Sequence, residues 1–212
     1  MGRVSQAQAA ENRERIVTTA ARLFRERGIS GVSVADVTAE AGLTHGGFYK
    51  HFASKDALVA EAVIRAFAEQ AAALGDTGSP AALIDAYLSA GHRDDPGAGC
   101  PSAGFGGDVA RSGGGDATRR AYAEGVEGFA RYLAGGDRHP ADGDRHPTGG
   151  EDREQADRGA DAGLATLSTM VGALILSRAT AGTALSDRIL TAARESLGLR
   201  DVNPVEAPAA GG

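Results

Sequence analysis

The sequence lacks the features of a secreted, membrane-spanning or disulfide-linked protein. Among its 212 residues there is no tryptophan, aromatic residues make up 5%, and Cys100 is the one cysteine. A single cysteine excludes an internal disulfide framework and fits a reducing cytoplasm. No unbroken apolar run predicts a transmembrane helix, and the N-terminus lacks the apolar core of a signal peptide. We therefore expect a cytoplasmic protein with no membrane partner.

The composition that remains favours helices. Hydrophobic residues make up 42% of the chain and charged residues 24%, which is typical of a globular protein. Small aliphatic side chains suit close helix packing better than a β-sheet, which favours aromatic and β-branched residues. No strand-like alternation occurs along the chain. The pattern predicts an all-α fold of about nine helices.

The net charge of −6 conceals an uneven distribution. Residues 1–56 carry eight lysine and arginine residues against six acidic residues, whereas the rest of the chain carries fourteen against twenty-two. A mildly basic N-terminal segment on an acidic body is compatible with local contact to phosphate groups.

The first 74 residues of the chain predict four helices. Apolar spacing predicts the first over 7–27 and the fourth over 55–74. Between them, Ser33 with Asp36 resembles a capping box that starts a short helix, and Thr44 starts a third. Two short helices joined by a tight turn at Gly42 make residues 33–52 a candidate helix-turn-helix.

The second helix of this unit would present donors to DNA. We expect Leu43 and Phe48 to wedge it against the first helix, and Gly46 and Gly47 to let the backbone approach a duplex closely. The donors to phosphates or base edges would be His45, Tyr49, Lys50 and His51.

The same segment resembles the TetR family of bacterial transcriptional regulators. The residues that carry the resemblance are Thr44-x-Gly46-x-x-Tyr49-x-His51-Phe52-x-Ser54-Lys55-Asp56-x-Leu58. The resemblance is specific over residues 10–70. One departure is Thr38, where the family more often has alanine, and we expect its hydroxyl to bond back to a main-chain carbonyl.

The resemblance implies a division of labour among the residues of a DNA-binding domain at 10–70. Double-stranded operator DNA would be the partner. Phosphates would be held by Thr44, Tyr49, His51 and Lys55. Bases would be read by His45, Gly46, Gly47 and Lys50, with help from Ser33 and Val34.

The rest of the chain, 75–200, would be a ligand-binding and dimerisation domain. Helices are predicted over 81–90, 101–111 and 116–133, with an apolar stripe at 164–178 and a last helix at 187–197 capped by Ser186. The resemblance implies a homodimer through the last two helices, whose stripes a monomer would expose. The interface candidates are Leu167, Val171, Leu174, Ile175, Ile189, Ala193 and Leu197.

A ligand pocket is also implied, and its candidate residues are mainly aromatic. They are Phe67, Tyr87, Cys100, Phe105, Tyr122 and Phe129, although ordinary core is the simpler interpretation of each aromatic residue. With few polar groups among them, a small hydrophobic or aromatic ligand is expected. Contact near Phe67 would tilt the helix at 55–74. Because nothing basic adjoins Cys100 in sequence, we expect a structural thiol and not a redox sensor.

The sequence Gly-Asp-Arg-His-Pro occurs at 136–140 and again at 143–147. Its histidines, His139 and His146, could form a metal or anion site, but a solvated loop over 134–152 is the simpler interpretation. Residues 201–212 are expected to be a disordered tail.

No catalytic constellation, metal motif or cofactor motif is recognisable in the sequence. We therefore expect a ligand-responsive repressor that is not an enzyme and has no cofactor. A ligand-blind DNA-binding protein and an all-α enzyme are the alternatives.

Overall fold

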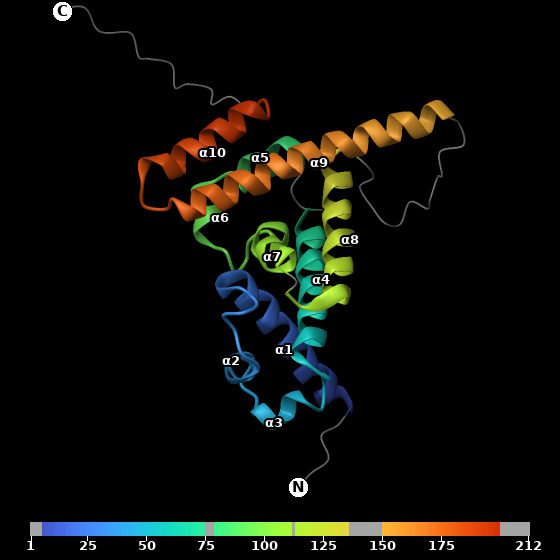
Figure 1. The fold of residues 1–212 in the computed structure, drawn as a ribbon, viewed down its shortest axis with the longest axis vertical. Helices are drawn as coiled ribbons and strands as arrows, with labels where there is room; N and C mark the ends of the chain where they lie inside the picture. Colours follow the sequence, from blue (N-terminus) through green and yellow to red (C-terminus); the bar gives the residue numbers. More distant parts are fainter. Residues whose placement is uncertain (1–5, 75–78, 112, 136–149, 200–212) are drawn as a thin grey trace, which may run out of the picture.

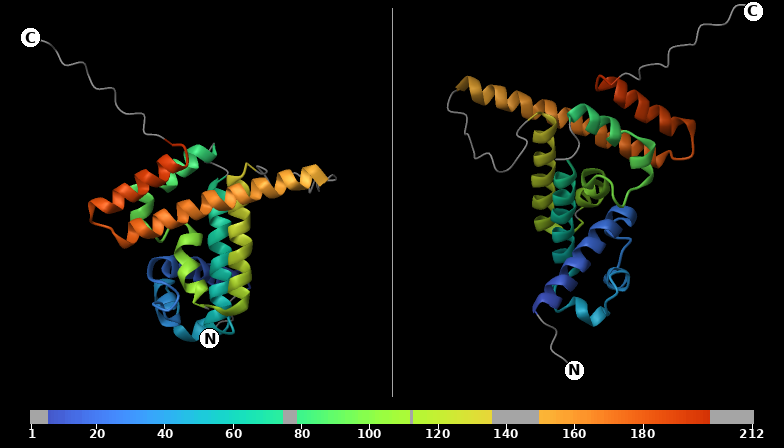
Figure 2. Two further views of the ribbon diagram at one scale, coloured as in Figure 1. Left: turned by 45° about the horizontal axis from the view of Figure 1, so that its top comes forward. Right: turned by 180° about the vertical axis from the view of Figure 1, so that it is seen from behind.

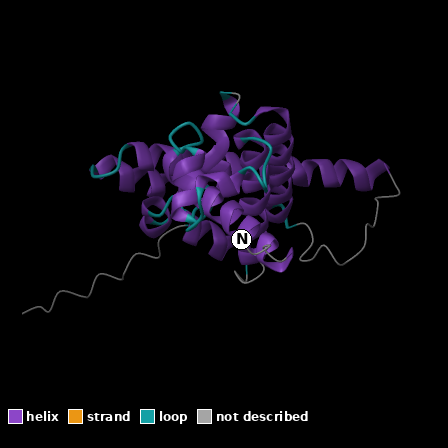
Figure 3. Cartoon of the chain, turned by 90° about the horizontal axis from the view of Figure 1, so that it is seen from below, coloured by secondary structure: helices purple, strands orange, loops and turns teal. Residues whose placement is uncertain are grey.

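The structure, a computed structural model, describes residues 6–74, 79–111, 113–135 and 150–199. Over this part of the chain it contains helices and loops and no strand (Figures 1 and 3), which confirms the all-α expectation. The helices are α1 (Gln6–Arg27), α2 (Val34–Glu40), α3 (His45–Phe48), α4 (Lys55–Leu74), α5 (Pro80–Tyr87), α6 (Ala90–Asp94), α7 (Pro101–Ala110), α8 (Gly115–Leu133), α9 (Gly150–Ala179) and α10 (Ala184–Ser196). The described part thus has ten helices where about nine were expected, because α6 is too short to show a periodicity.

Helices α1, α2 and α3 form one end of the molecule, and α4 runs from this end into the body (Figure 1). Their apolar faces meet in one core, where Phe24, Val37, Phe48 and Leu58 are fully buried. Phe105 of α7 is buried in the same core, so the N-terminal unit and the body share apolar packing.

The body is built around α4 and α8, which lie side by side (Figures 1 and 2). Helix α9 crosses their ends, α10 turns back along α9, and the first turns of α9 project beyond the body. A second core joins these helices and buries Leu88, Met170 and Leu174.

Several local expectations are confirmed. The Ser33 hydroxyl accepts from the Asp36 N–H at 3.1 Å, and the Asp36 carboxylate accepts from the Ser33 N–H at 2.8 Å, so the capping box is formed. The Ser54 hydroxyl accepts from the Ala57 N–H, which caps α4. The buried Thr38 hydroxyl donates to the Val34 carbonyl at 3.0 Å. The serine caps therefore set the helix starts around the turn.

The predicted cap at Ser186 is wrong. Helix α10 begins at Ala184 after Thr183, and Ser186 is fully buried inside its first turn. Its hydroxyl donates to the Ser177 carbonyl of α9 at 2.7 Å and accepts from Arg93 at 2.9 Å. A contact between helices has therefore replaced the local cap. Helix α9 also begins at Gly150, earlier than expected, whereas the repeat with His139 and His146 and the tail at 201–212 lie outside the described residues.

The expected exposure of the C-terminal stripe is corrected by the structure. Leu167, Leu174 and Ala193 are buried within one chain, because α9 and α10 pack on each other and α9 packs on α8. Val171, Ile189 and Leu197 are partly buried, and Ile175 is 44% exposed. The large apolar side chains that a single chain does expose on α9 and α10 are Leu164, Ile175, Leu176 and Leu185.

One segment of α9 is long and apolar enough to cross a membrane, although it contains no unbroken apolar run. Arg158–Ala179 has a mean hydropathy of 1.4, which by length and composition suffices to cross a bilayer. A helix that packs in a protein core passes the same test, and here α9 packs against α8 and α10.

Candidate functional site

The turn between α2 and α3 has the geometry that the sequence predicted. Gly42 has φ 68°, a left-handed conformation that glycine adopts without a steric penalty. Leu43 packs against the N-terminal core and Phe48 is fully buried within it. The Arg22 guanidinium of α1 pairs with Glu40 at 2.6 Å, and Arg15 donates to the Ala41 carbonyl at 2.7 Å. The end of α2 is thus held against α1.

Two glycines in α3 have no structural role that the fold explains. A side chain at Gly46 would meet no atom within 4 Å, and one at Gly47 would lie in ordinary contact with Thr44. Neither glycine has a positive φ. Consecutive glycines weaken a helix, and α3 is accordingly limited to His45–Phe48. The open backbone at these positions is a surface that a partner can approach closely.

The side chains around these glycines face outward. Tyr49 is 62% exposed, and His45 and Lys50 are also exposed. The Tyr49 ring lies edge-on to His45 and Phe48, with centroid distances of 5.7 Å and 5.1 Å. A buried aromatic ring therefore supports an exposed one whose hydroxyl is free to reach outward.

The other predicted DNA contacts differ in how available their side chains are. Ser33 is exposed, but its hydroxyl donates to Asp36 at 2.6 Å within the capping box. That bond and the Ser33 N–H lower the pKa of the Asp36 carboxyl, which keeps the cap ionised. Val34 and His51 are half-buried, whereas Thr44 is exposed and makes no side-chain cap bond in α3.

Lys55 differs most from expectation. Its ammonium donates to the Ile29 carbonyl at 2.5 Å and lies 5.8 Å from the centre of the Phe24 ring. The same Ile29 residue donates its N–H to Asp108 of α7 at 2.8 Å. Lys55 therefore connects the start of α4 to the turn after α1 through this hydrogen bond.

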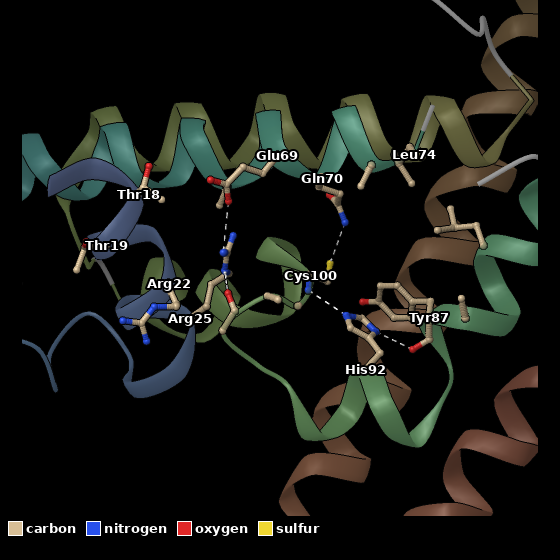
Figure 4. Close-up of a pocket in the computed structure, with 17 residues that line it drawn as sticks. Thr18, Thr19, Arg22, Arg25, Glu69, Gln70, Leu74, Tyr87, His92 and Cys100 are labelled. Carbon is tan, nitrogen blue, oxygen red and sulfur yellow. Dashed lines mark hydrogen bonds and ion pairs between the residues drawn. The ribbon is translucent and has the colours of Figure 1, made fainter. Parts of the chain in front are cut away.

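A pocket of about 550 Å³ lies where α1, α4 and the α5–α7 region meet (Figure 4). Its lining residues are Thr18, Thr19, Arg22, Arg25, Ala66, Glu69, Gln70, Ala73, Leu74, Leu83, Ala86, Tyr87, His92, Gly97, Ala98, Gly99 and Cys100. Because α1 belongs to the N-terminal unit and α4 extends from it, a molecule bound here would touch that unit directly.

Of the six predicted pocket residues, Tyr87 and Cys100 line this pocket and the other four do not. Phe105 and Phe129 are buried core, and Phe67 packs against the Tyr122 ring at 5.9 Å and over Gly125. Tyr122 is bound through its hydroxyl to the Ser102 carbonyl at 2.7 Å. The large aromatic side chains were needed to fill the space between helices, so the ordinary-core interpretation holds for these four.

The sequence interpretation missed the polar wall of the pocket. The Arg25 side chain is 7% exposed, its Nε donates to the Gly97 carbonyl at 2.7 Å, and its Nη2 lies 3.5 Å from Glu69. Burial lowers the pKa of Arg25, and the carboxylate of Glu69 partly opposes that effect. A signal was present, since Arg25 follows the buried Val17 and Ala21 at spacings of four on one face of α1.

His92 joins the other side of the pocket to α5 and α7. Its Nε2 accepts from the Cys100 N–H at 3.1 Å, so Nδ1 carries the proton and donates to the Tyr87 carbonyl at 2.7 Å. Burial lowers the pKa of His92 and raises that of the Tyr87 hydroxyl well above its usual value. Both groups are therefore neutral near pH 7. Within the described residues, no cluster of histidine, cysteine and acidic side chains has the arrangement of a metal site.

Comparison with known proteins agrees with this geometry. Residues 16–62, which run from α1 through the turn into α4, match the family model described as bacterial regulatory proteins, tetR family. Residues 16–62 are therefore a helix-turn-helix segment of the TetR type. Curated proteins similar to this segment include YerO of Bacillus subtilis, an uncharacterized HTH-type transcriptional regulator that is 40% identical over 52 residues, covering 24% of this chain and 18% of YerO. AcrR of Shigella flexneri, an HTH-type transcriptional regulator, is 38% identical over 61 residues, covering 29% of this chain and 28% of AcrR.

Sequence similarity to these curated relatives is confined to less than a third of their length. Similarity of fold extends much further. A TetR-family regulator from Cytophaga hutchinsonii superposes with a TM-score of 0.64 at 18% identity, covering 93% of this chain and 97% of that one. The reduced form of NemR from E. coli gives 0.62 at 16% identity, covering 87% and 96%. The similarity of fold therefore extends over the body as well as the helix-turn-helix.

Proposed function

We propose that this protein is a cytoplasmic, homodimeric transcriptional repressor that binds a palindromic operator and is released by a small molecule. The observation that carries the proposal is the exposed face of α3. His45, Tyr49 and Lys50 project from a unit whose core is closed, and Gly46 and Gly47 leave the backbone beside them open. Donors on a rigid support with close backbone access are what reading a major groove requires.

The residues divide by their availability. His45 and Lys50 are free to reach base edges, and Tyr49 and Thr44 to reach phosphates. Lys55 supports the unit through Ile29, so any contact that it makes with phosphate comes in addition to that role. The excess of basic over acidic residues in 1–56 favours approach to a polyanion.

The second copy of the chain would dock on α9 and α10. Ile175, Leu176 and Leu185 are between 44% and 57% exposed, which is unfavourable for such side chains in water. A twofold arrangement through this surface would present two α3 helices to one duplex. Their centres must then lie about 34–36 Å apart, or a further helical turn, to enter successive major grooves.

Release would begin at the pocket. Its walls come from α1 and α4, and from the segment that leads to Cys100 and α7. Contact with Phe67 itself does not start the change, since Phe67 packs against Tyr122 of α8. The residues of α4 that line the pocket are Ala66, Glu69, Gln70, Ala73 and Leu74. Occupancy would shift α4 or α7 against α1, and both helices hold Ile29 in the N-terminal unit.

The proposal is tested by selecting bound duplexes from a random pool with the full chain. We expect a palindrome whose half-sites are protected in footprinting. A thermal-shift screen of small amphipathic molecules, repeated with the selected duplex, then tests release. A ligand that stabilises the protein should lower operator affinity, and operator should lower ligand affinity by the same factor. Recovery of no common sequence would refute the repressor, and a bound ligand with no effect on DNA would leave a ligand-blind DNA-binding protein.

A further inference from the structure

Two buried polar groups in the pocket lack a full set of partners. The hydroxyl of Tyr87 is buried and has no hydrogen-bond partner among the described residues. The residue as a whole is 5% exposed, and its ring is fixed edge-on against His92 at 4.5 Å. A buried hydroxyl without a partner is unfavourable, so this donor is suited to an oxygen acceptor that enters the pocket.

The second group is the Arg25 guanidinium. It carries five N–H donors, and one of them, on Nε, makes a short hydrogen bond to the Gly97 carbonyl at 2.7 Å. The ion pair with Glu69 is long, at 3.5 Å, and Glu69 makes a shorter one, at 2.7 Å, with Arg65. Arg65 also pairs with Glu14. Arg25 is therefore a buried cation whose counter-charge is shared with a second arginine.

The charges on the walls favour an anion over a cation. The lining contains two arginines, Arg22 and Arg25, and one carboxylate, Glu69, while His92 is neutral. Arg22 is held at the rim by Glu26 and Glu40, which leaves Arg25 as the cation inside. Carboxylates form charge-assisted, bidentate bonds with a guanidinium, which makes them the best-matched anionic group.

Between the two polar groups the walls are mainly apolar, and the one amide there, that of Gln70, donates to the Cys100 sulfur at 3.5 Å. Figure 4 shows Arg25 beside Glu69 at one side of the pocket and Tyr87 at the other, with Cys100 and Gln70 between them. Small and aliphatic side chains also line the pocket: Ala66, Ala73, Leu74, Leu83 and Ala86. A molecule that satisfies both ends must therefore be apolar in its middle.

We propose that the pocket binds an amphipathic carboxylic acid with a second oxygen function at its far end. Its carboxylate accepts from Arg25, its apolar body lies along the alanine and leucine side chains, and its distal oxygen accepts from the Tyr87 hydroxyl. This rests on the proposed function only in taking the pocket as the ligand site. It adds a route of regulation, since a carboxylate on Arg25 competes with Glu69 and so weakens a contact between α1 and α4.

Calorimetric titration of the full chain without DNA tests this with three matched series of probes. They are ω-hydroxy fatty acids, the corresponding unsubstituted acids and the methyl esters of the hydroxy acids, each of about six to fourteen carbon atoms to cover the pocket volume. We expect the best hydroxy acid to bind at least about tenfold more tightly than its ester and several-fold more tightly than the unsubstituted acid.

Two variants test which residue binds each end of the ligand. Arg25→Gln should abolish the preference for acid over ester, and Tyr87→Phe should abolish the preference for the hydroxy acid over the unsubstituted acid. Arg119→Gln, at an exposed position on α8, should change neither. Circular dichroism melts check folding, and Arg25→Lys, which keeps the charge, should retain part of the acid preference.

Equal binding of acid and ester, an acid preference that survives in a folded Arg25→Gln protein, or no binding across the series would each overturn the proposal. Because the titration contains no DNA, these outcomes leave the selection of operator duplexes unaffected. Conversely, selective binding of the hydroxy acids by a protein that selects no duplex would uphold this site and refute the repressor.

Discussion

The carboxylate of Asp108, near the end of α7, accepts a hydrogen bond from the backbone N–H of Ile29 at 2.8 Å. Ile29 follows α1 in the N-terminal unit, and its carbonyl accepts from Lys55 at the start of α4. At its other end α7 begins directly after Cys100, which lines the pocket. One peptide segment of the N-terminal unit is thus bonded to both helices that run from the pocket.

Replacing Asp108 with alanine should therefore destabilise the protein. The side chain is 12% exposed and its bond to Ile29 is charge-assisted, so we expect the free energy of unfolding to fall by about 1–3 kcal/mol. Urea denaturation followed by circular dichroism measures this. Asp116→Ala is the control, because that side chain is 84% exposed and should change stability little. Equal effects of the two substitutions would remove the special role of Asp108.

Lys50→Ala should relax sequence preference without unfolding the protein. Lys50 is exposed and its side chain makes no hydrogen bond or ion pair within the described residues, so its removal should cost about 1–3 kcal/mol on the selected duplex and much less on random DNA. Fluorescence anisotropy on both duplexes measures the difference. Arg131→Ala, at an exposed position in the last turn of α8 where this helix meets α9, provides a control for loss of one positive charge. A uniform loss on both duplexes would assign Lys50 to phosphate and not to bases.

Substitutions on α9 should separate dimerisation from folding. Ile175→Glu with Leu176→Glu alters exposed residues and should give a folded monomer in sedimentation velocity. Leu174→Glu places a charge in the core of one chain and should instead unfold it, because Leu174 is fully buried. A wild-type protein that sediments as a monomer at micromolar concentration would contradict the dimer.

His92 predicts a dependence of stability on pH. Its pKa is lowered from 6.5 by burial and next by Arg178, against the bond to the Tyr87 carbonyl and the charge of Asp95. The unfolded chain therefore takes up the proton first, and the stabilisation is complete above about pH 6.5 and is lost as the pH falls toward the lower, folded value.

The measurement is the melting temperature between about pH 7.5 and about pH 5.5, where histidine titrates. The wild type should lose more stability over this range than His92→Gln, which has no titrating ring. His45→Gln is the matched control, because His45 is exposed and should leave the slope unchanged. Parallel slopes for the wild type and His92→Gln would contradict the assignment.

The N-terminal unit could be predicted from sequence because its signals are local. The pairing of Ser33 with Asp36, the glycine at position 42 and the apolar spacing each act within a few residues, and the structure confirms each of them. Ser186 shows where such reasoning ends. Its local signal is a helix cap, but a bond to Ser177 of another helix decides its place.

The pocket could not be predicted for the same reason. Its polar wall is assembled from Arg25, Glu69 and His92, which lie far apart in sequence and have no spacing in common. Aromatic residues such as Phe105 are candidates for a ligand pocket by sequence, yet large side chains are those most needed to fill a core. The residues that face the cavity are instead those whose side chains the packing of α1, α4, α5 and α6 does not cover.

The most direct test of the account is the affinity of the full chain for the selected duplex, for a single half-site and for a scrambled duplex of equal length, measured by anisotropy at one salt concentration. If the two α3 helices of a dimer bind specifically, the affinity for the full palindrome should be about a thousandfold or more above that for scrambled DNA. The affinity for the single half-site should be much lower than that for the full palindrome. Equal affinities for the three duplexes would contradict sequence-specific recognition by α3.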